Sequence, residues 1–226
     1  MWHKHHACHQ IPKYMQKQQY LISDPDELRR IKFAQFRVQV PILIVLALAI
    51  ILDRIFHGAG NWIYGISLAL AIGALVAYFF VGLCFRFRQR IPMPSEDALL
   101  SPVEGRISRI VHDGNHTLLT IRKGIFDSVE LRSPHEDCKL EDGMLWLETP
   151  AGKIQFRFSF QRIQWFVEPD MKAGNLIGMV VGNGSCTVVL PGKPELTLQE
   201  REAVKAAENL AEPEVLSLYG LTDQTE

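Results

Sequence analysis

The sequence predicts a membrane-anchored all-β protein: an N-terminal transmembrane helical hairpin, then a small β barrel-sandwich domain, then a C-terminal helix. Two long apolar segments precede residue 92, apolar residues then recur with a period of two, and a helical spacing returns near the end. We therefore expect four regions: a polar cytosolic tail at 1–32, the hairpin at 33–91, the β domain at 92–192 and a helical tail at 193–226.

The composition limits the class of protein before any motif is considered. The chain has 226 residues, 47% of them hydrophobic, which suits one core-bearing domain plus an anchor and excludes a disordered chain. Its formal net charge is only −1 and its Lys and Arg residues build no continuous basic face, so we expect no nucleic-acid partner. The four cysteines are scattered without a CxxC pair, which favours a reducing compartment over a disulfide framework or zinc site.

The segment 62–85 carries the clearest membrane signal. It contains no charged residue and exceeds the about 20 apolar residues that cross a hydrocarbon core. Trp62 and Tyr64 lie at one end and three further aromatic residues at 78–80, where their rings favour the membrane interfaces. Arginines follow directly at positions 86, 88 and 90, so we expect this end to stay on the cytoplasmic side.

The segment 33–56 is a weaker span, because Arg37 and Pro41 lie in its first half and a charged pair closes it. Residues 42–52 alone also fit a buried helix of a soluble protein. Beside the segment 62–85, however, a hairpin is favoured. The first apolar run begins only after residue 32, which is too late for a cleavable signal peptide.

Basic residues flank the hairpin on the side of the two chain ends. Those before the first segment are Lys13, Lys17, Arg29, Arg30, Lys32 and Arg37. Because positive residues stay inside, we expect a multi-pass protein of the cytoplasmic (inner) membrane whose soluble domain faces the cytosol. Its expected partner is membrane phospholipid.

Short strands are expected after the proline-marked linker at 92–94, separated by turns rich in Gly, Asp and Asn. The eight expected strands are Gly105–Val111, Thr117–Arg122, Val129–Arg132, Met144–Thr149, Lys153–Phe160, Ile163–Val167, Leu176–Val181 and Cys186–Leu190. This pattern is typical of a compact barrel or sandwich.

A helix is expected near the end of the chain. Thr197 to Glu200 matches a capping box, and apolar residues at 203, 204, 207 and 210 follow at helical spacing until Pro213. We expect this helix to pack onto the β domain, in preference to binding a partner or lying on the membrane surface.

Five short motifs follow one another between residues 85 and 191. They are Phe85-Arg-Phe-Arg88, Ser101-Pro-Val-Glu-Gly105, the strand from Ile125 to Pro134, the turn from Glu168 to Gly178, and Gly184-Ser-Cys-Thr-Val-Val-Leu-Pro191. In this order they resemble the short, bacterial type of phosphatidylserine decarboxylase, over the region from about Ile42 to Pro191. Each motif is weak alone, but five in order are hard to obtain by chance.

The resemblance implies a pyruvoyl-dependent lyase of phospholipid metabolism. In the family, a serine after a glycine attacks the preceding carbonyl, and elimination leaves a pyruvoyl group that forms a Schiff base with the substrate amine. Gly184-Ser185 has that form, so Ser185 would be the nucleophile and the source of the pyruvoyl cofactor, with no metal required. The substrate would be phosphatidylserine or a similar amino-phospholipid.

The chain departs from the family at the residues that assist serine attack. Glu104 stands where the family has an aspartate, and Val129 stands where it has a histidine. Because valine can neither take nor give a proton, His135 is the substitute base that we consider. The segment from 135 to 153 is shorter than in the family, and a helix replaces the family's final glycine turn and strand, so the substrate pocket should also differ.

Two function classes therefore remain open, an active decarboxylase and a non-catalytic relative that serves as a membrane-anchored lipid- or protein-binding module.

Each candidate residue also has a structural interpretation. Ser185 fits a strand that begins at a glycine turn, Glu104 a solvated turn carboxylate, Asp127 a backbone cap, and His135 an exposed loop histidine. The N-terminal cluster of His3, His5, His6, Cys8 and His9 is expected to bind metal only incidentally.

Overall fold

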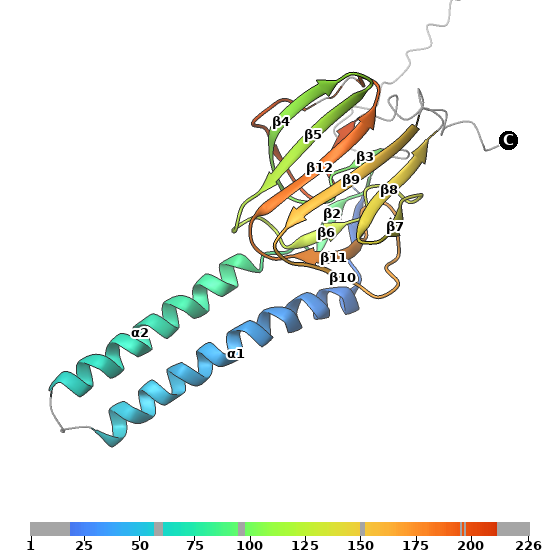
Figure 1. The fold of residues 1–226 in the computed structure, drawn as a ribbon. Helices are drawn as coiled ribbons and strands as arrows, with labels where there is room; N and C mark the ends of the chain where they lie inside the picture. Colours follow the sequence, from blue (N-terminus) through green and yellow to red (C-terminus); the bar gives the residue numbers. More distant parts are fainter. Residues whose placement is uncertain are drawn as a thin grey trace, which may run out of the picture.

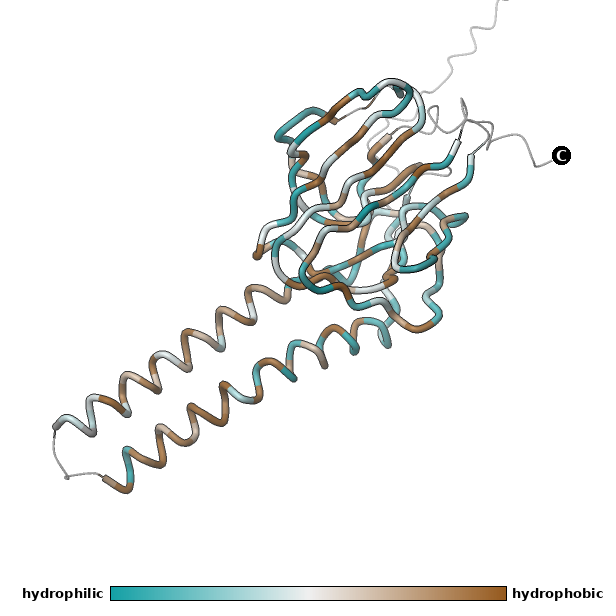
Figure 2. Tube along the Cα trace, viewed as in Figure 1, coloured by the Kyte–Doolittle hydropathy of each residue, from teal (hydrophilic) through white to brown (hydrophobic). Residues whose placement is uncertain are grey.

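The computed structural model describes residues 19–56, 61–94, 98–149, 152–194, 196 and 198–211. Two long helices extend side by side from one end of a β domain (Figure 1). The chain along these helices is mostly apolar away from the domain and becomes more hydrophilic in the first turns of the first helix (Figure 2).

The hairpin consists of α1 (Pro25–Ile55) and α2 (Asn61–Cys84). Helix α1 begins where Asp24 accepts a hydrogen bond from the Asp26 N–H at 2.8 Å, with Pro25 in the first position, where its missing N–H is not needed. Both helices are long and apolar enough to cross a membrane. Two helices are therefore confirmed, and membrane anchoring stays a prediction.

The apolar side chains of the hairpin are largely exposed, because the two helices cover only one face of each other. In the most apolar stretch of each helix only 11% of the residues are buried. Ile44, Leu48 and Ile51 of α1 are each more than half exposed. The stretch 42–52 is thus not a helix buried inside this fold.

Helix α1 starts eight residues before the segment expected from its apolar content. The extra turns lie against the β domain, where Leu28 and Ile31 are buried. The two strands that flank the hairpin, β1 (Tyr20–Ile22) and β2 (Arg90–Pro92), pair antiparallel. The chain is therefore fastened where it enters and where it leaves the hairpin.

The main sheet has seven strands and is antiparallel throughout. Its order is β13 (Ala203–Val204), β4 (Gly105–Asp113), β5 (His116–Lys123), β12 (Gly184–Pro191), β9 (Gly152–Phe160), β8 (Met144–Thr149) and β7 (Lys139–Glu141). Alternate apolar residues of the central strands point into one core, as the period of two in the sequence predicts.

Two smaller sheets cover that core. One has the order β10 (Ile163–Trp165), β11 (Leu176–Val180), β6 (Glu130–Arg132), and the other pairs β14 (Asn209–Ala211) with β3 (Leu99–Leu100). All eight expected strands form, with bounds shifted by a few residues. Across the described residues the sheets stay open, so the closed barrel of the expectation is not seen.

The expected C-terminal helix is wrong over the residues that the structure describes there, 198–211. This stretch forms β13 and β14 with turns between them, while 212–226 lie outside the described residues. Arg201 and Ala207 have φ angles of 71° and 62°, which an α-helix cannot contain. Apolar residues of this stretch, such as Val204 and Leu210, are buried, but in strands. Strand β13 pairs with β4, and β14 pairs with β3. This pairing supplies hydrogen-bond partners for the backbone groups at the edges of β3 and β4.

Two parts of the domain repeat the same local structure. We call them the first Ser-Pro unit (98–104 with 201–211) and the second Ser-Pro unit (130–136 with 168–178). In the first unit, Ser101 N–H donates to Glu208 O and Ala207 N–H donates to Ser101 O, each at 2.8 Å. In the second unit, Ser133 N–H donates to Asn175 O at 2.8 Å, and Gly174 N–H donates to Ser133 O at 2.9 Å.

The two units also bind each other reciprocally. Leu100 N–H donates to Pro134 O, and Arg132 N–H donates to Pro102 O, both at 2.9 Å. Each unit carries two positive φ angles six residues apart, at 201 and 207 in the first and at 168 and 174 in the second. The units are thus related by an approximate two-fold axis.

Candidate functional site

Gly184 and Ser185 begin β12, in the middle of the main sheet. Ser185 lies opposite Arg122 of β5 on one side and Ser159 of β9 on the other. This end of the sheet lies near the hairpin (Figure 1), since the ring of Phe126, just beyond β5, packs edge to face on Phe80 of α2 with centroids 5.7 Å apart. The Gly-Ser pair therefore lies near the hairpin end of the sheet but inside a regular ladder on both sides.

The glycine at 184 has a packing reason. A Cβ atom there would lie 2.2 Å from Cδ1 of Phe160 and 2.5 Å from the carbonyl oxygen of Ser159, well inside van der Waals contact. The close approach of β9 therefore requires glycine, whatever the chemistry of Ser185. The structural interpretation of the Gly-Ser pair is consistent with this packing.

Lys123 is a buried cation beside the Gly184-Ser185 pair, and the sequence analysis did not identify it. It lies directly opposite Gly184 and is only 1% exposed. Its Nζ donates to the carbonyl oxygens of Gly124, Asp127 and Gly182 at 3.0 to 3.2 Å, which uses all three ammonium protons. Burial lowers the pKa of Lys123, while the negative charges of Asp127 and Glu104 oppose this change. The three acceptors favour the protonated form, so we regard Lys123 as a structural cation.

Glu104 and Asp127 have different surroundings. Oε2 of Glu104 lies 3.8 Å from Nη2 of Arg88, and both residues border a cavity of about 200 Å³. Oδ2 of Asp127 accepts a hydrogen bond from the Gly124 N–H at 2.6 Å. The interpretation of Asp127 as a backbone cap is therefore confirmed, whereas Glu104 is paired with a cation and partly covered.

Val129 lies where the family resemblance places a histidine, and it is completely buried. It belongs to an apolar cluster that joins the β domain to the ends of the hairpin and includes Ile31, Phe85 and Met179. Its N–H donates to Arg86 O at 2.8 Å. The valine therefore has a role in seating the domain on the hairpin.

His135 is not the exposed loop histidine of the expectation, because it is only 4% exposed. Its Nδ1 accepts a hydrogen bond from the Asp137 N–H at 3.1 Å and lies 3.6 Å from that residue's carboxylate. Within the described part of the chain, no hydrogen bond or ion pair links His135 to Ser185 or to Glu104. The structure thus does not assemble the expected nucleophile, carboxylate and base into one hydrogen-bonded set.

Comparisons with models of protein families, with curated proteins and with solved structures find no match to this chain. The family resemblance therefore rests on the five motifs alone.

Among the described residues, no group of three or more His, Cys, Asp or Glu side chains could hold a metal ion. The N-terminal His and Cys cluster lies outside those residues.

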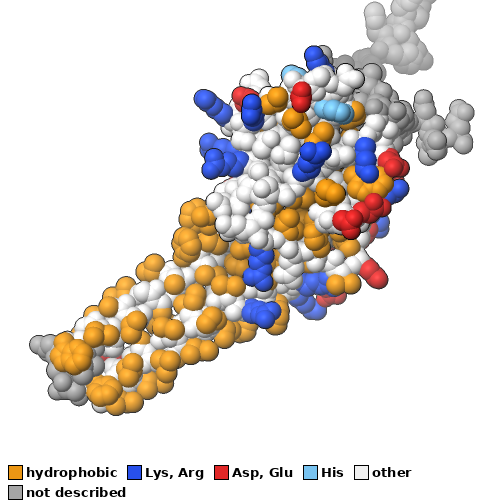
Figure 3. All heavy atoms as spheres, viewed as in Figure 1, with side chains coloured by type: hydrophobic (Ala, Val, Ile, Leu, Met, Phe, Trp, Pro, Cys, Tyr) orange, Lys and Arg blue, Asp and Glu red, His pale blue; other side chains and the backbone are white. Residues whose placement is uncertain are grey.

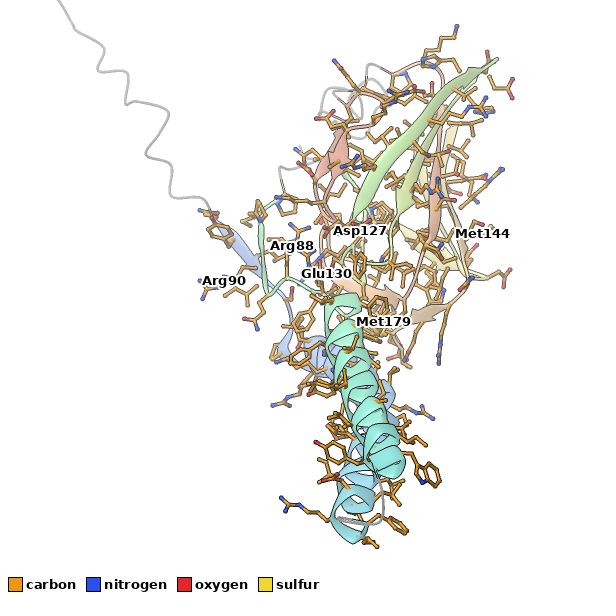
Figure 4. All side chains as sticks on the ribbon, turned by 90° about the vertical axis from the view of Figure 1, so that its left-hand side faces the viewer. Arg88, Arg90, Asp127, Glu130, Met144 and Met179 are labelled. Carbon is orange, nitrogen blue, oxygen red and sulfur yellow. The ribbon has the colours of Figure 1, made fainter. Side chains whose placement is uncertain are left out.

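A buried ion pair connects the second Ser-Pro unit to the hairpin. Glu130 and Arg132 are both fully buried, and Nε of Arg132 donates to Oε2 of Glu130 at 2.9 Å. Arg132 also donates to Ser23 Oγ before α1 and to Arg88 O after α2, at 3.0 and 3.1 Å. The other Glu130 oxygen accepts the Arg88 N–H. Figure 4 shows Arg88 and Glu130 together above the end of α2, with Arg90 farther out.

A larger cavity lies where α1 meets the β domain, and we call it the junction cavity. Its volume is about 770 Å³. Its lining combines four arginines with apolar side chains: Arg29, Arg30, Phe33, Ala34, Arg37, Val38, Phe85, Arg162, Gln164, Met179 and Val181. Met179 lies just above the end of the hairpin (Figure 4). The sequence analysis used the basic residues of α1 only for topology and did not connect them with Arg162.

Proposed function

We propose that this protein is a membrane-anchored, non-catalytic relative of the short phosphatidylserine decarboxylases, whose β domain works as a lipid-binding module. The observation that carries this proposal is the surroundings of Ser185. The serine lies in a two-sided ladder, Val129 replaces the family's histidine inside an apolar cluster, and His135 is engaged with Asp137. These residues do not fit the formation of a pyruvoyl group.

The chemical reason is the missing proton acceptor. A serine hydroxyl needs a base within hydrogen-bond reach before it can attack the preceding carbonyl. Lys123 lies opposite Gly184, but its three carbonyl acceptors hold its proton. The Gly184-Ser185 bond should therefore stay intact, and the module needs no cofactor.

The second candidate function is an active pyruvoyl-dependent decarboxylase. It is favoured by the place of Gly184-Ser185 at the end of the sheet that lies toward the hairpin, where a phospholipid head group could approach (Figure 1). In that case Ser185 would supply the pyruvoyl group, and Glu104 would be the carboxylate nearest to the family pattern.

The intact mass of the full chain, purified in detergent, tests the proposal. We expect one species of 25.7 kDa. Cleavage after Gly184 would instead give fragments 1–184 and 185–226, the latter with a blocked N-terminus. If the natural chain is processed and the Ser185→Ala chain stays whole, the second candidate replaces the first.

We further propose that the hairpin spans the cytoplasmic membrane with both chain ends and the β domain in the cytosol. The arginines of α1 that line the junction cavity support this, because they lie at the domain end of the hairpin, whereas Arg54 at the far end follows Asp53. An Arg109→Cys variant, which places a thiol on exposed β4, should resist a membrane-impermeant thiol reagent added to whole cells and react after lysis. Labelling in whole cells would indicate the opposite orientation, with the β domain outside the cytosol.

A further inference from the structure

The junction cavity lies at the level where the apolar surface of the hairpin ends. Figure 3 shows apolar side chains covering the hairpin and Lys and Arg side chains gathered where it meets the β domain. With the hairpin in a bilayer, this level corresponds to the head-group layer. A ligand of the cavity would therefore come from the membrane surface.

The charges of the cavity favour an anion. Among the residues that the structure describes, four arginines line it and no acidic side chain does. Arg29 and Arg30 are partly neutralised by Asp26 and Glu27, at 2.9 and 3.7 Å. Arg37 and Arg162 are both exposed, and neither has a hydrogen bond or ion pair within the described part of the chain. These two guanidinium groups are available for a ligand.

The apolar lining narrows the class of anion. Phe33 is 69% exposed and Val38 is 43% exposed, and both face the same cavity as Arg37. Met179 and Val181 of the β domain line it too. A free phosphate would leave these apolar groups in water, whereas a phospholipid would cover them with its acyl chains. Arginine suits the phosphate because its planar group can donate two parallel hydrogen bonds.

We propose that the junction cavity binds one anionic phospholipid, with its phosphate at Arg37 and Arg162 and its acyl chains along Phe33 and Val38. This inference rests on the proposed lipid-binding function and names the site and the ligand class. The site is distinct from the Gly-Ser pair, because neither Gly184, Ser185 nor the residues paired with them across the sheet line the cavity. The bound lipid would fix the β domain against the membrane surface.

Native mass spectrometry of the full chain in detergent tests this site. With dioleoyl phosphatidylglycerol we expect one retained lipid, and about tenfold weaker retention of dioleoyl phosphatidylcholine, which carries no net charge. An Arg37→Gln/Arg162→Gln variant should retain phosphatidylglycerol about 30-fold less, since each cation near an anionic lipid contributes about fivefold. An Arg37→Lys/Arg162→Lys variant keeps both charges and should lose much less.

A charge-matched control separates a site from general attraction. Arg109→Gln/Arg157→Gln removes two exposed arginines of β4 and β9 that do not line the cavity. This control should retain the lipid as the natural chain does, and an equal loss in both variants would overturn the proposal. Inorganic phosphate that binds as tightly as the lipid would also overturn it. The mass of the chain itself is read in the same spectrum, so a processed chain and an absent lipid are distinguished.

Discussion

The two Ser-Pro units have the same backbone but different contents. At equivalent positions the first unit carries Ala98 and Leu100, whereas the second carries Glu130 and Arg132, and all four residues are buried. Leu100 joins a small apolar cluster, while Arg132 reaches Ser23 and Arg88 at the two ends of the hairpin. The same fold element therefore serves as plain core in one place and as an attachment for the hairpin in the other.

The difference shows what a buried charge contributes here. A buried ion pair adds little to stability compared with apolar side chains that fill the same space, because both ions lose their hydration. Arg132 instead satisfies carbonyl and hydroxyl groups of the segments before α1 and after α2. Those segments connect the domain to the hairpin, and an apolar residue such as Leu100 could not hydrogen-bond to them.

The largest expected loss of stability comes from replacing Arg132 of the second unit by leucine, the residue at the equivalent position of the first unit. Arg132→Leu leaves the Glu130 carboxylate buried without its cation, and should lower the free energy of unfolding by about 3–5 kcal/mol. Denaturant unfolding of the full chain in detergent measures this. Glu130→Ala/Arg132→Leu removes both charges and should recover part of the loss, because the bonds from Arg132 to Ser23 and Arg88 stay absent. Equal losses in the single and the double variant would contradict the role of the ion pair.

A smaller effect is expected at the turn that both units share. Gly174 has a φ of 81°, and a Cβ atom there would lie 3.1 Å from Cδ1 of Ile91. Gly174→Ala should therefore cost about 1–3 kcal/mol of unfolding free energy. Ala207 already holds the equivalent position at a φ of 62°, so Ala207→Gly should change stability by less than about 1 kcal/mol. Thermal unfolding of both variants tests this, and equal destabilisation would argue against equivalent turns.

The smallest effect concerns the two serines. Ser101 Oγ donates to Val103 O at 2.7 Å, and Ser133 Oγ donates to His135 O at 2.9 Å. Replacing either serine by alanine leaves a buried carbonyl short of one partner, so each change should cost about 1 kcal/mol. Similar losses in thermal unfolding would support the two-fold relation. A loss at Ser133 alone would show that the second unit depends on its serine in a way that the first does not.

The repeat itself was open to detection in the sequence. Ser-Pro occurs at 101 and again at 133, and Lys-Ala occurs at 172 and again at 205. These pairs are too short to stand out by themselves, and the first unit has Ala207 where the second has Gly174. The helical spacing of residues 203–210 therefore dominated the prediction, although the free edges of β3 and β4 decide that stretch.

The candidate site was predictable only in part. The sequence identifies Gly184, Ser185 and Glu104 through their motifs, but the burial of Lys123, the packing behind Gly184 and the engagement of His135 depend on segments far apart in the chain. The junction cavity was even less predictable from the sequence. Arg37 and Arg162 are 125 residues apart in the numbering, and only the seating of α1 against β10 and β11 brings them to one cavity.

The sequence alone determined the features that depend on neighbouring residues. A long uncharged apolar run dictates a helix that could span a membrane, and a period of two with glycine turns dictates short strands, because each is a local match of side chains to backbone geometry. The tertiary structure alone decided which strand edges residues 198–211 complete, which charges are buried together, and which arginines share a cavity. These depend on contacts between distant segments, whose partners no local pattern specifies.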